Sequence, residues 1–213
     1  MNYTSLKTSI ADWIARSDLT SGTLDDLIDF AEARINRELR VRAMESIYFR
    51  ELDSDASAAV PTTYRQWKNA YLYKGTPDTT DTFNAFANTL VSPLQTTQMA
   101  GAAQDFQFSR GNGLWLTRIG PRFYVSGKPS GTYSLGGIYY AGFTALSGAA
   151  PTNWLTDTAP DLLLSACMFE AATYIKNQTE MQFWAARTTA LLGQVQAESD
   201  REQWSGEQMV TRP

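Results

Sequence analysis

The sequence contains no histidine and a single cysteine, and these absences remove most of the usual catalytic groups. Histidine is the commonest general base and metal ligand, and serine and cysteine nucleophiles usually depend on it. Cys167 cannot form a disulfide within the chain, and the apolar run around it, LLLSACMFEAA, predicts a small buried side chain. The glycine patterns that bind nucleotides are also missing. We therefore expect no enzyme, no cofactor and no metal site.

An excess of positive charge is missing as well. The net charge is −4, and charged residues make up 19% of the chain. Residues 1–46 carry 6 basic and 8 acidic groups, and residues 150–200 carry 2 and 6. Proteins that grip nucleic acid through its phosphates present a basic surface. This charge distribution instead suits a protein whose partners are other proteins.

Long hydrophobic runs are also absent. A membrane helix needs about 20 mainly apolar residues, and no window of the sequence approaches that. The first residues, MNYTSLKTSIADW, have no basic region followed by an apolar stretch, so we do not expect a signal peptide. These features predict synthesis in the cytoplasm and no membrane partner.

Residues 1–46 predict a pair of amphipathic helices. The first spans Tyr3 to Arg16, and its apolar residues recur at helical spacing: Leu6, Ile10, Trp13 and Ile14. Thr23 is placed to cap the second, whose apolar stripe comprises Leu24, Leu27, Ile28, Ala31, Ile35 and Leu39. Acidic residues come early and arginines late, which matches the helix dipole. The ordinary interpretation is a solvated face. The alternative is that the arginine end faces an acidic neighbouring subunit.

Residues 47–149 predict an inserted antiparallel β-rich region with long loops. Tyr64–Tyr73 mixes aromatic and charged residues in the manner of a strand. Residues 75–113 are mostly small and polar and show little pattern until Phe106. From there, turn sequences separate four short strand-like segments, FQFS, LWLTRI, FYVS and TYSLGGIYYAGF. Their close spacing predicts a meander within one sheet.

Residues 150–200 predict a second helix pair. The first of these helices lies near Asp161–Asn177, behind Pro160, and is apolar over more than half its girth, which predicts a central position. The other covers about Thr179–Asp200, with one inward line of Met181, Trp184, Thr188, Leu191 and Val195. Residues 201–213 lack periodicity and predict an extended tail.

The expected fold class is therefore α+β. Neither helix pair can bury its apolar stripe alone, so the simplest packing brings the N- and C-terminal pairs together as a helical bundle. The β-rich region is then an insertion into that helical body.

Three sets of polar or aromatic residues could have a functional role. Asp53 with Asp55, and Asp78 with Asp81, have acidic spacing but lack the glycine and closing glutamate of a calcium loop, which favours solvated loops. A glycosidase needs two carboxylates that face each other, and the sequence does not single out any such pair. The aromatic residues of the strands could form a stacking platform for sugars or bases. Alternation along a strand turns about half of them inward, which favours a role in the core. The set comprises Trp115, Phe123, Tyr124, Tyr133, Tyr139, Tyr140 and Phe143.

Three segments, taken in order, carry a resemblance. They are TLDDLIDFAEARINRELRVRAME, then GGIYYAGFTALSGAAPTNWLTDTAPDLLLSACMFEAATYIKN, then the last helix with its polar exit. Within the second, Tyr139-Tyr140-Ala141 precedes Asn153-Trp154-Leu155 and the pair Pro160-Asp161. In this succession the chain resembles a family of bacteriophage head-to-tail adaptor proteins. Residues 75–113 depart from the family's pattern.

The resemblance implies a structural virion protein at the head-tail junction, made in the host cytoplasm. It implies a homo-oligomeric ring of about twelve copies that binds the portal protein and a tail or nozzle protein, with DNA passing through the channel without sequence-specific binding. The portal-binding tail would use Trp204, Met209, Val210 and Arg212. Candidate channel-lining or subunit-interface charges are Asp25, Asp29, Arg34, Arg37 and Glu180. The alternative is a tail-associated carbohydrate- or receptor-binding module that uses the strand aromatics.

Overall fold

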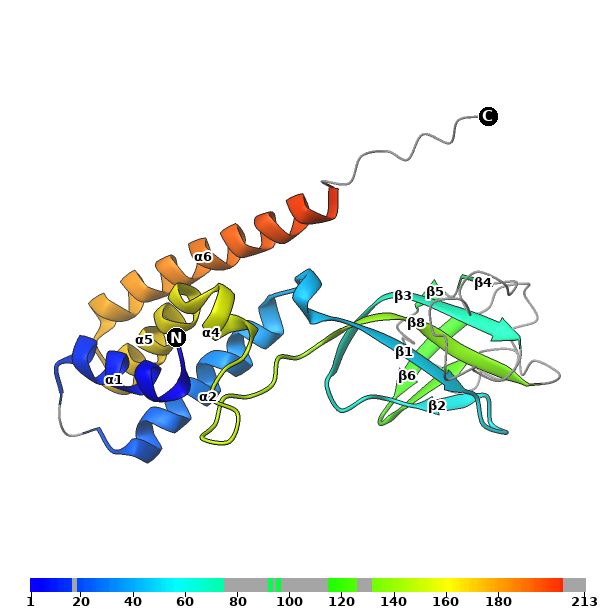
Figure 1. Cartoon of the computed structure of the whole chain (residues 1–213), viewed down its shortest axis with the longest axis horizontal. Coiled ribbons are helices and arrows are strands. Elements are labelled where there is room, and N and C mark those ends of the chain that lie inside the picture. The colour runs from blue at the N-terminus through cyan, green and yellow to red at the C-terminus, as the bar shows by residue number, and fades with distance from the viewer. Residues whose placement is uncertain (17–18, 75–91, 94, 97–114, 126–131, 205–213) are drawn as a thin grey trace. The chain divides into compact units, whose positions relative to one another are not determined.

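The computed structural model describes residues 1–16, 19–74, 92–93, 95–96, 115–125 and 132–204. The chain mixes helices with sheets and divides into two compact units (Figure 1). The helical unit comprises Met1–Met44 and Gly142–Pro213, and the sheet unit comprises Glu45–Ala141. The expected insertion was 47–149, so residues 142–149 are placed with the helices instead.

The helical unit contains five α-helices within its described residues. They are α1 (Tyr3–Ile14), α2 (Ser21–Glu38), α4 (Trp154–Thr158), α5 (Pro160–Tyr174) and α6 (Gln178–Trp204). A short 3₁₀ turn, Arg42–Met44, follows α2. Helix α5 contacts α1, α2, α4 and α6, and Leu162, Leu163, Ala166 and Cys167 are fully buried within it. These contacts confirm the predicted central position of this helix. Its apolar residues cover most of its circumference, so it can be packed on several sides.

Helix boundaries differ from the expectation at several places. Helix α1 ends at Ile14 and not at Arg16, and α5 ends at Tyr174 and not at Asn177. Thr20, and not Thr23, caps α2, and its side chain accepts a hydrogen bond from the Thr23 backbone N–H. An N-cap hydroxyl accepts a hydrogen bond from the N–H two or three residues later, and Thr20 stands three residues before the Thr23 N–H that it accepts from. Helix α6 runs on to Trp204, so residues 201–204 are helical and not part of an extended tail.

In the described residues of the sheet unit, the strands form two four-stranded sheets. One has the order β1-β8-β3-β4 and the other β2-β7-β6-β5. The strands are β1 (Glu45–Glu51), β2 (Ser57–Ala59), β3 (Tyr64–Lys74), β4 (Ser92–Pro93), β5 (Gln95–Thr96), β6 (Trp115–Ile119), β7 (Arg122–Val125) and β8 (Tyr133–Ala141). All pairings are antiparallel except β5 with β6, which is parallel.

The predicted meander is wrong in one respect. Strands β6 and β7 form the expected hairpin, but β8 belongs to the other sheet, between β1 and β3. The segments FQFS and RGNG lie outside the described residues. Strand β1, which pairs with β8 over its whole length, was not predicted.

Aromatic residues from both sheets form the core of the sheet unit. Tyr48, Trp67 and Tyr139 come from the first sheet and Phe123 from the second, and all four are buried. Tyr48 and Phe123 meet edge to face with ring centroids 5.8 Å apart. Rings in edge-to-face and tilted contact thus fill the space between the two sheets, and each ring buries a large area.

One glycine in β8 is required by close backbone contact. Gly137 has a φ of +155°, and a Cβ atom there would lie 2.2 Å from the Asn69 carbonyl oxygen of β3. Next to it, β3 carries two irregularities in register, and the Asn69 side chain accepts a hydrogen bond from the Ile138 N–H. A side chain at position 137 would therefore force the two strands apart.

Candidate interaction surfaces

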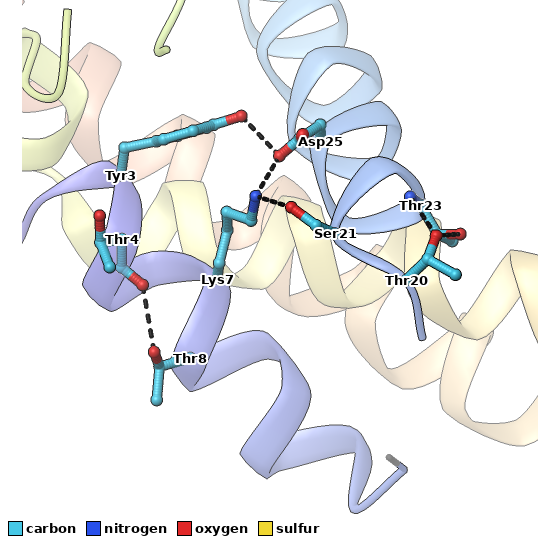
Figure 2. Close-up of polar contacts among 8 residues, drawn as sticks. All are labelled: Tyr3, Thr4, Lys7, Thr8, Thr20, Ser21, Thr23 and Asp25. Atoms are coloured by element: carbon cyan, nitrogen blue, oxygen red, sulfur yellow. Dashed lines mark hydrogen bonds and ion pairs between the residues drawn. The ribbon is translucent and has the colours of Figure 1, made fainter. Parts of the chain in front are cut away.

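A polar network at the start of the chain joins α1 to α2. The Tyr3 hydroxyl and the Lys7 ammonium both donate to Asp25 Oδ1 at 2.6 Å, and Lys7 also donates to Ser21 Oγ at 2.6 Å. Figure 2 shows the Tyr3 and Lys7 side chains of α1 converging on the Asp25 carboxylate of α2, with Ser21 bonded to Lys7. The network aligns the first turns of the two helices.

The network also sets the protonation of its members. Hydrogen bonds from Lys7 and then from Tyr3 hold the pKa of Asp25 below its usual value. Burial, and next the hydrogen bond to Asp25, raises the pKa of Tyr3 to about 12. Asp25, predicted as a channel or interface charge, is thus neutralised locally by Lys7. It contributes little net field to a neighbouring molecule.

Two buried polar residues of α2 hold the segment that follows β8. Glu32, 3% exposed, accepts hydrogen bonds from the Leu146 N–H at 3.0 Å and from the Asn153 side-chain amide at 2.8 Å. One turn later, Asn36 accepts from the Phe143 N–H at 2.9 Å. Burial raises the pKa of Glu32. Helix α2 therefore supplies acceptors to a backbone segment that lacks secondary-structure partners.

The arginines predicted on α2 differ in their surroundings. Arg34 forms ion pairs with Glu38 at 3.6 Å and with Glu170 at 3.5 Å, and its guanidinium stacks 4.0 Å from the Phe169 ring centroid. Arg37 is exposed, although its charge acts on Glu170. Arg34 thus stabilises the packing of α2 on α5, whereas Arg37 is available to a partner at the surface.

The remaining predicted site residues are placed as follows. Asp29 is exposed on α2. Glu180 is exposed in the first turn of α6 and accepts a hydrogen bond from Trp184 Nε1 at 3.0 Å. Trp204 is the last residue of α6. Met209, Val210 and Arg212 lie outside the described residues.

An aromatic cluster at one end of the helical unit was missed by the sequence reasoning. Trp13 of α1 and Phe183 of α6 are 54% and 56% exposed, and both pack on the buried Trp184. On α2, Phe30 is 58% exposed. Phe30 and Phe183 fall outside the apolar stripes of their helices, and this offset is the sequence signal that could have identified them.

The strand aromatics are mostly interior. Phe123 and Tyr139 are buried, and Tyr124, Tyr133 and Tyr140 are half-buried. Phe143 stacks on Trp154 in the helical unit, with ring planes 7° apart. Trp115 begins β6, and its side chain is not described. Core packing thus accounts for Phe123, Tyr133 and Tyr139, which leaves too few exposed rings to favour a sugar-binding platform among the described residues.

Side chains with reactive or metal-binding groups are buried or bonded to other residues of the chain at the positions considered next. Cys167 is fully buried, and burial raises the pKa of its thiol far above the usual range, so it is not a thiolate nucleophile. Asp53 accepts hydrogen bonds from Ser57 and pairs with Arg122. Within the part of the chain that is described, no three His, Cys, Asp or Glu side chains gather to hold a metal ion.

A small pocket lies beside the end of α6. It has a volume of about 90 Å³ and is lined by residues that include Val41, Trp154, Val195 and Glu198. Ligand sites for drug-sized molecules are several times larger, about 300–1,000 Å³. The pocket suits a few water molecules or a single side chain. No described helix is long and apolar enough to cross a membrane.

Comparison with known proteins identifies the family of the chain. No curated protein matches the chain. The SU10 adaptor protein family matches residues 1–212, which span both the helical unit and the sheet unit. Because the match extends over nearly the whole sequence, the chain belongs to the SU10 adaptor protein family, a family of phage head-to-tail adaptors.

Proposed function

We propose that this phage structural adaptor forms a closed ring between the portal and the tail or nozzle, around the channel through which DNA passes. The observation that carries the proposal is the family match over residues 1–212, which includes both units and not one module alone. We further propose that the N- and C-terminal helices form a bundle that builds the wall of the ring. A ring of about twelve copies fits the resemblance described above.

The charged surface supports a structural role around DNA. Asp29 and Glu180 are exposed, and neither has a basic ion-pair partner among the described residues. Facing the channel, such carboxylates would repel phosphates and let DNA slide. Asp25 is a weaker candidate because Lys7 already compensates its charge. Changing Asp29 and Glu180 together to lysine should slow DNA ejection, and unchanged packaging and ejection would remove this assignment.

Portal binding is assigned to the C-terminal end. Helix α6 is 27 residues long and ends at Trp204, ahead of Met209, Val210 and Arg212. Removal of residues 205–213 leaves every described helix intact, so the shortened chain should fold normally and lose portal binding. Retained binding would refute this role. The change Trp204→Ala then tests the anchor separately.

The whole proposal is tested by mass measurement. Light scattering of the purified chain, alone and mixed with portal-bearing particles of the parent phage, should show stoichiometric capture of many copies per particle. A stable monomer that fails to bind the particles would contradict the adaptor role. The test needs the particles, because an adaptor can remain monomeric until it docks.

A further inference from the structure

The outer face of α6 is unusual for a long surface helix because its centre is made of small residues. On the side opposite the buried Trp184, Thr188 and Leu192, the exposed positions are Phe183, Ala186, Ala190, Gly193 and Ala197. They follow one another at steps of three and four residues, which is the spacing of a line along one helix face. Long polar side chains, which normally cover such a face, are confined to its flanks.

No contact within its own chain explains why residue 193 is a glycine. It lies in the middle of α6, where glycine weakens a helix, and a Cβ atom there would meet nothing within 4 Å. Close packing against its own helices is therefore not the reason for a glycine at this position. A second molecule that approaches α6 from outside would provide one.

The outer face of α2 carries the complementary features. Asp26, Phe30, Ala33 and Arg37 lie along one exposed line, with Phe30 in its middle. Phe30 is more than half exposed, so a large apolar side chain projects from this face. Helices pack by fitting the ridges of one into the grooves of the other, and a line of small residues leaves a groove that a projecting ring can enter.

The two faces point away from each other within one protomer. Both α2 and α6 contact α5, and Figure 1 shows them on either side of it, running in the same general direction. The hydrogen bonds agree with this direction: Arg34 reaches the last turn of α5 at Glu170, and Arg40, beyond the end of α2, bonds Gln196 late in α6. A subunit with two different faces on opposite sides can join head to tail into a ring.

The charges on the two faces match in one register. Asp26 and Arg37 are 11 residues apart on α2, and Arg187 and Glu198 are 11 residues apart on α6, flanking its small-residue line. Each spacing is about 16 Å along a helix axis. A parallel alignment sets Asp26 against Arg187 and Arg37 against Glu198. An antiparallel alignment would set like charges together at both ends.

We propose, as an extension of the ring proposed above, that the outer face of α2 on one copy packs in parallel against the outer face of α6 on the next copy. In this register Phe30 lies level with residue 191 and enters the shallow groove at Ala190 and Gly193. Neighbours in a ring of many copies are related by a small rotation, so helices that run in the same direction within one copy remain nearly parallel across the contact.

Cross-linking between two singly substituted full-length chains tests the contact. Phe30→Cys and Gly193→Cys chains are mixed, added to portal-bearing particles and treated with a short bis-maleimide. The native Cys167 is fully buried and does not compete. Covalent dimers should form from the mixture and not from either variant alone, because the contact joins two different faces. The matched control is Phe30→Cys with Thr173→Cys, an exposed position of α5 that lies on neither face.

The outcomes separate the contact from the proposed function. Capture with dimers from the mixture supports the inference. Capture without these dimers, or linkage of Gly193→Cys to a portal or tail protein, overturns the contact while the ring at the portal stands. Absence of capture for the unsubstituted chain overturns the proposed function, and this inference with it.

Charge reversal provides an independent measurement. Asp26→Arg and Arg187→Asp should each weaken capture by about tenfold, since each places like charges in contact. The chain that carries both changes should regain most of the loss. The Asp26→Arg chain should melt as the unsubstituted chain does, because this position is exposed. Arg187 is also exposed, but its guanidinium lies 5.7 Å from the centroid of the Trp184 ring, so both chains that carry Arg187→Asp should show the same small loss of stability, and capture is compared between them at a temperature well below melting. Equal defects in the single and the double variants would contradict the register.

Discussion

Removal of the buried Glu32 carboxylate should release the segment that returns from the sheet unit to the helical unit. In Glu32→Ala, the N–H of Leu146 and the side-chain amide of Asn153 both lose their acceptor. A buried donor left without a partner costs about 1–3 kcal/mol, and relief of the buried charge offsets part of this. We expect the free energy of unfolding of the helical unit to fall by about 2–4 kcal/mol.

Hydrogen exchange detected by mass spectrometry is the appropriate assay. The chain contains two compact units, so a single melting temperature does not isolate one of them. A peptide covering residues 142–153 should exchange faster in Glu32→Ala, and a peptide from the middle of α6 should change much less. The matched control is Glu38→Ala, which removes an exposed glutamate from the same helix and should alter stability by no more than about 0.5 kcal/mol.

The raised pKa of Glu32 also fixes the direction in which the free energy of unfolding changes with pH. Burial raises the pKa of Glu32, so the folded chain keeps this proton to higher pH than the unfolded chain does. The free energy of unfolding therefore falls as the pH rises from the usual carboxyl pKa through the raised value. In Glu32→Gln this decline should be absent, and the similar contribution of Glu170 should remain in both proteins. Unchanged exchange of residues 142–153 in Glu32→Ala, or identical pH profiles, would refute the reasoning.

Three further changes have expected outcomes. Gly137→Ala should destabilise the sheet unit by at least about 2 kcal/mol, because the new Cβ collides with the Asn69 carbonyl. The near-ultraviolet circular dichroism of the aromatic core should then be lost at a lower urea concentration than in the unsubstituted chain, and an unchanged midpoint would contradict this. A double-mutant cycle with Lys7→Met and Asp25→Asn should give a coupling energy below about 1 kcal/mol in urea unfolding, since the pair is partly exposed, and a larger value would contradict this. Gly193→Ala should raise the free energy of unfolding by about 0.5–1 kcal/mol in the same assay, and a loss would show that its surroundings are not open.

Local patterns predicted the helices well. The apolar stripe at Leu24, Ile28 and Ile35 corresponds to buried residues of α2, and the run around Cys167 is the core of α5. Such patterns are reliable because helix hydrogen bonds and i, i+4 neighbours all lie within a few residues. The hairpin of β6 and β7 was predictable for the same reason, since its two strands are adjacent in sequence.

The placement of strands in sheets could not be read in this way. Strand β8 pairs with β1, about 90 residues earlier, and leaves β7 in the other sheet. Strand β1 carries Tyr48 into a core that only exists once both sheets have assembled. Pairing over such separations depends on the sum of tertiary contacts, and the sequence near each strand holds little information about it.

The same distinction between local pattern and tertiary structure applies to the candidate interaction surfaces. The sequence by itself determined the absence of histidine-based chemistry, the helical segments, their charges and the family, because these depend on residue identity and short-range spacing. Only the tertiary structure decided that Arg34 is engaged with Glu170 while Phe30 and Gly193 face outward. Exposure is a property of the packed chain: a side chain is free for a partner only when no other element of its own fold covers it.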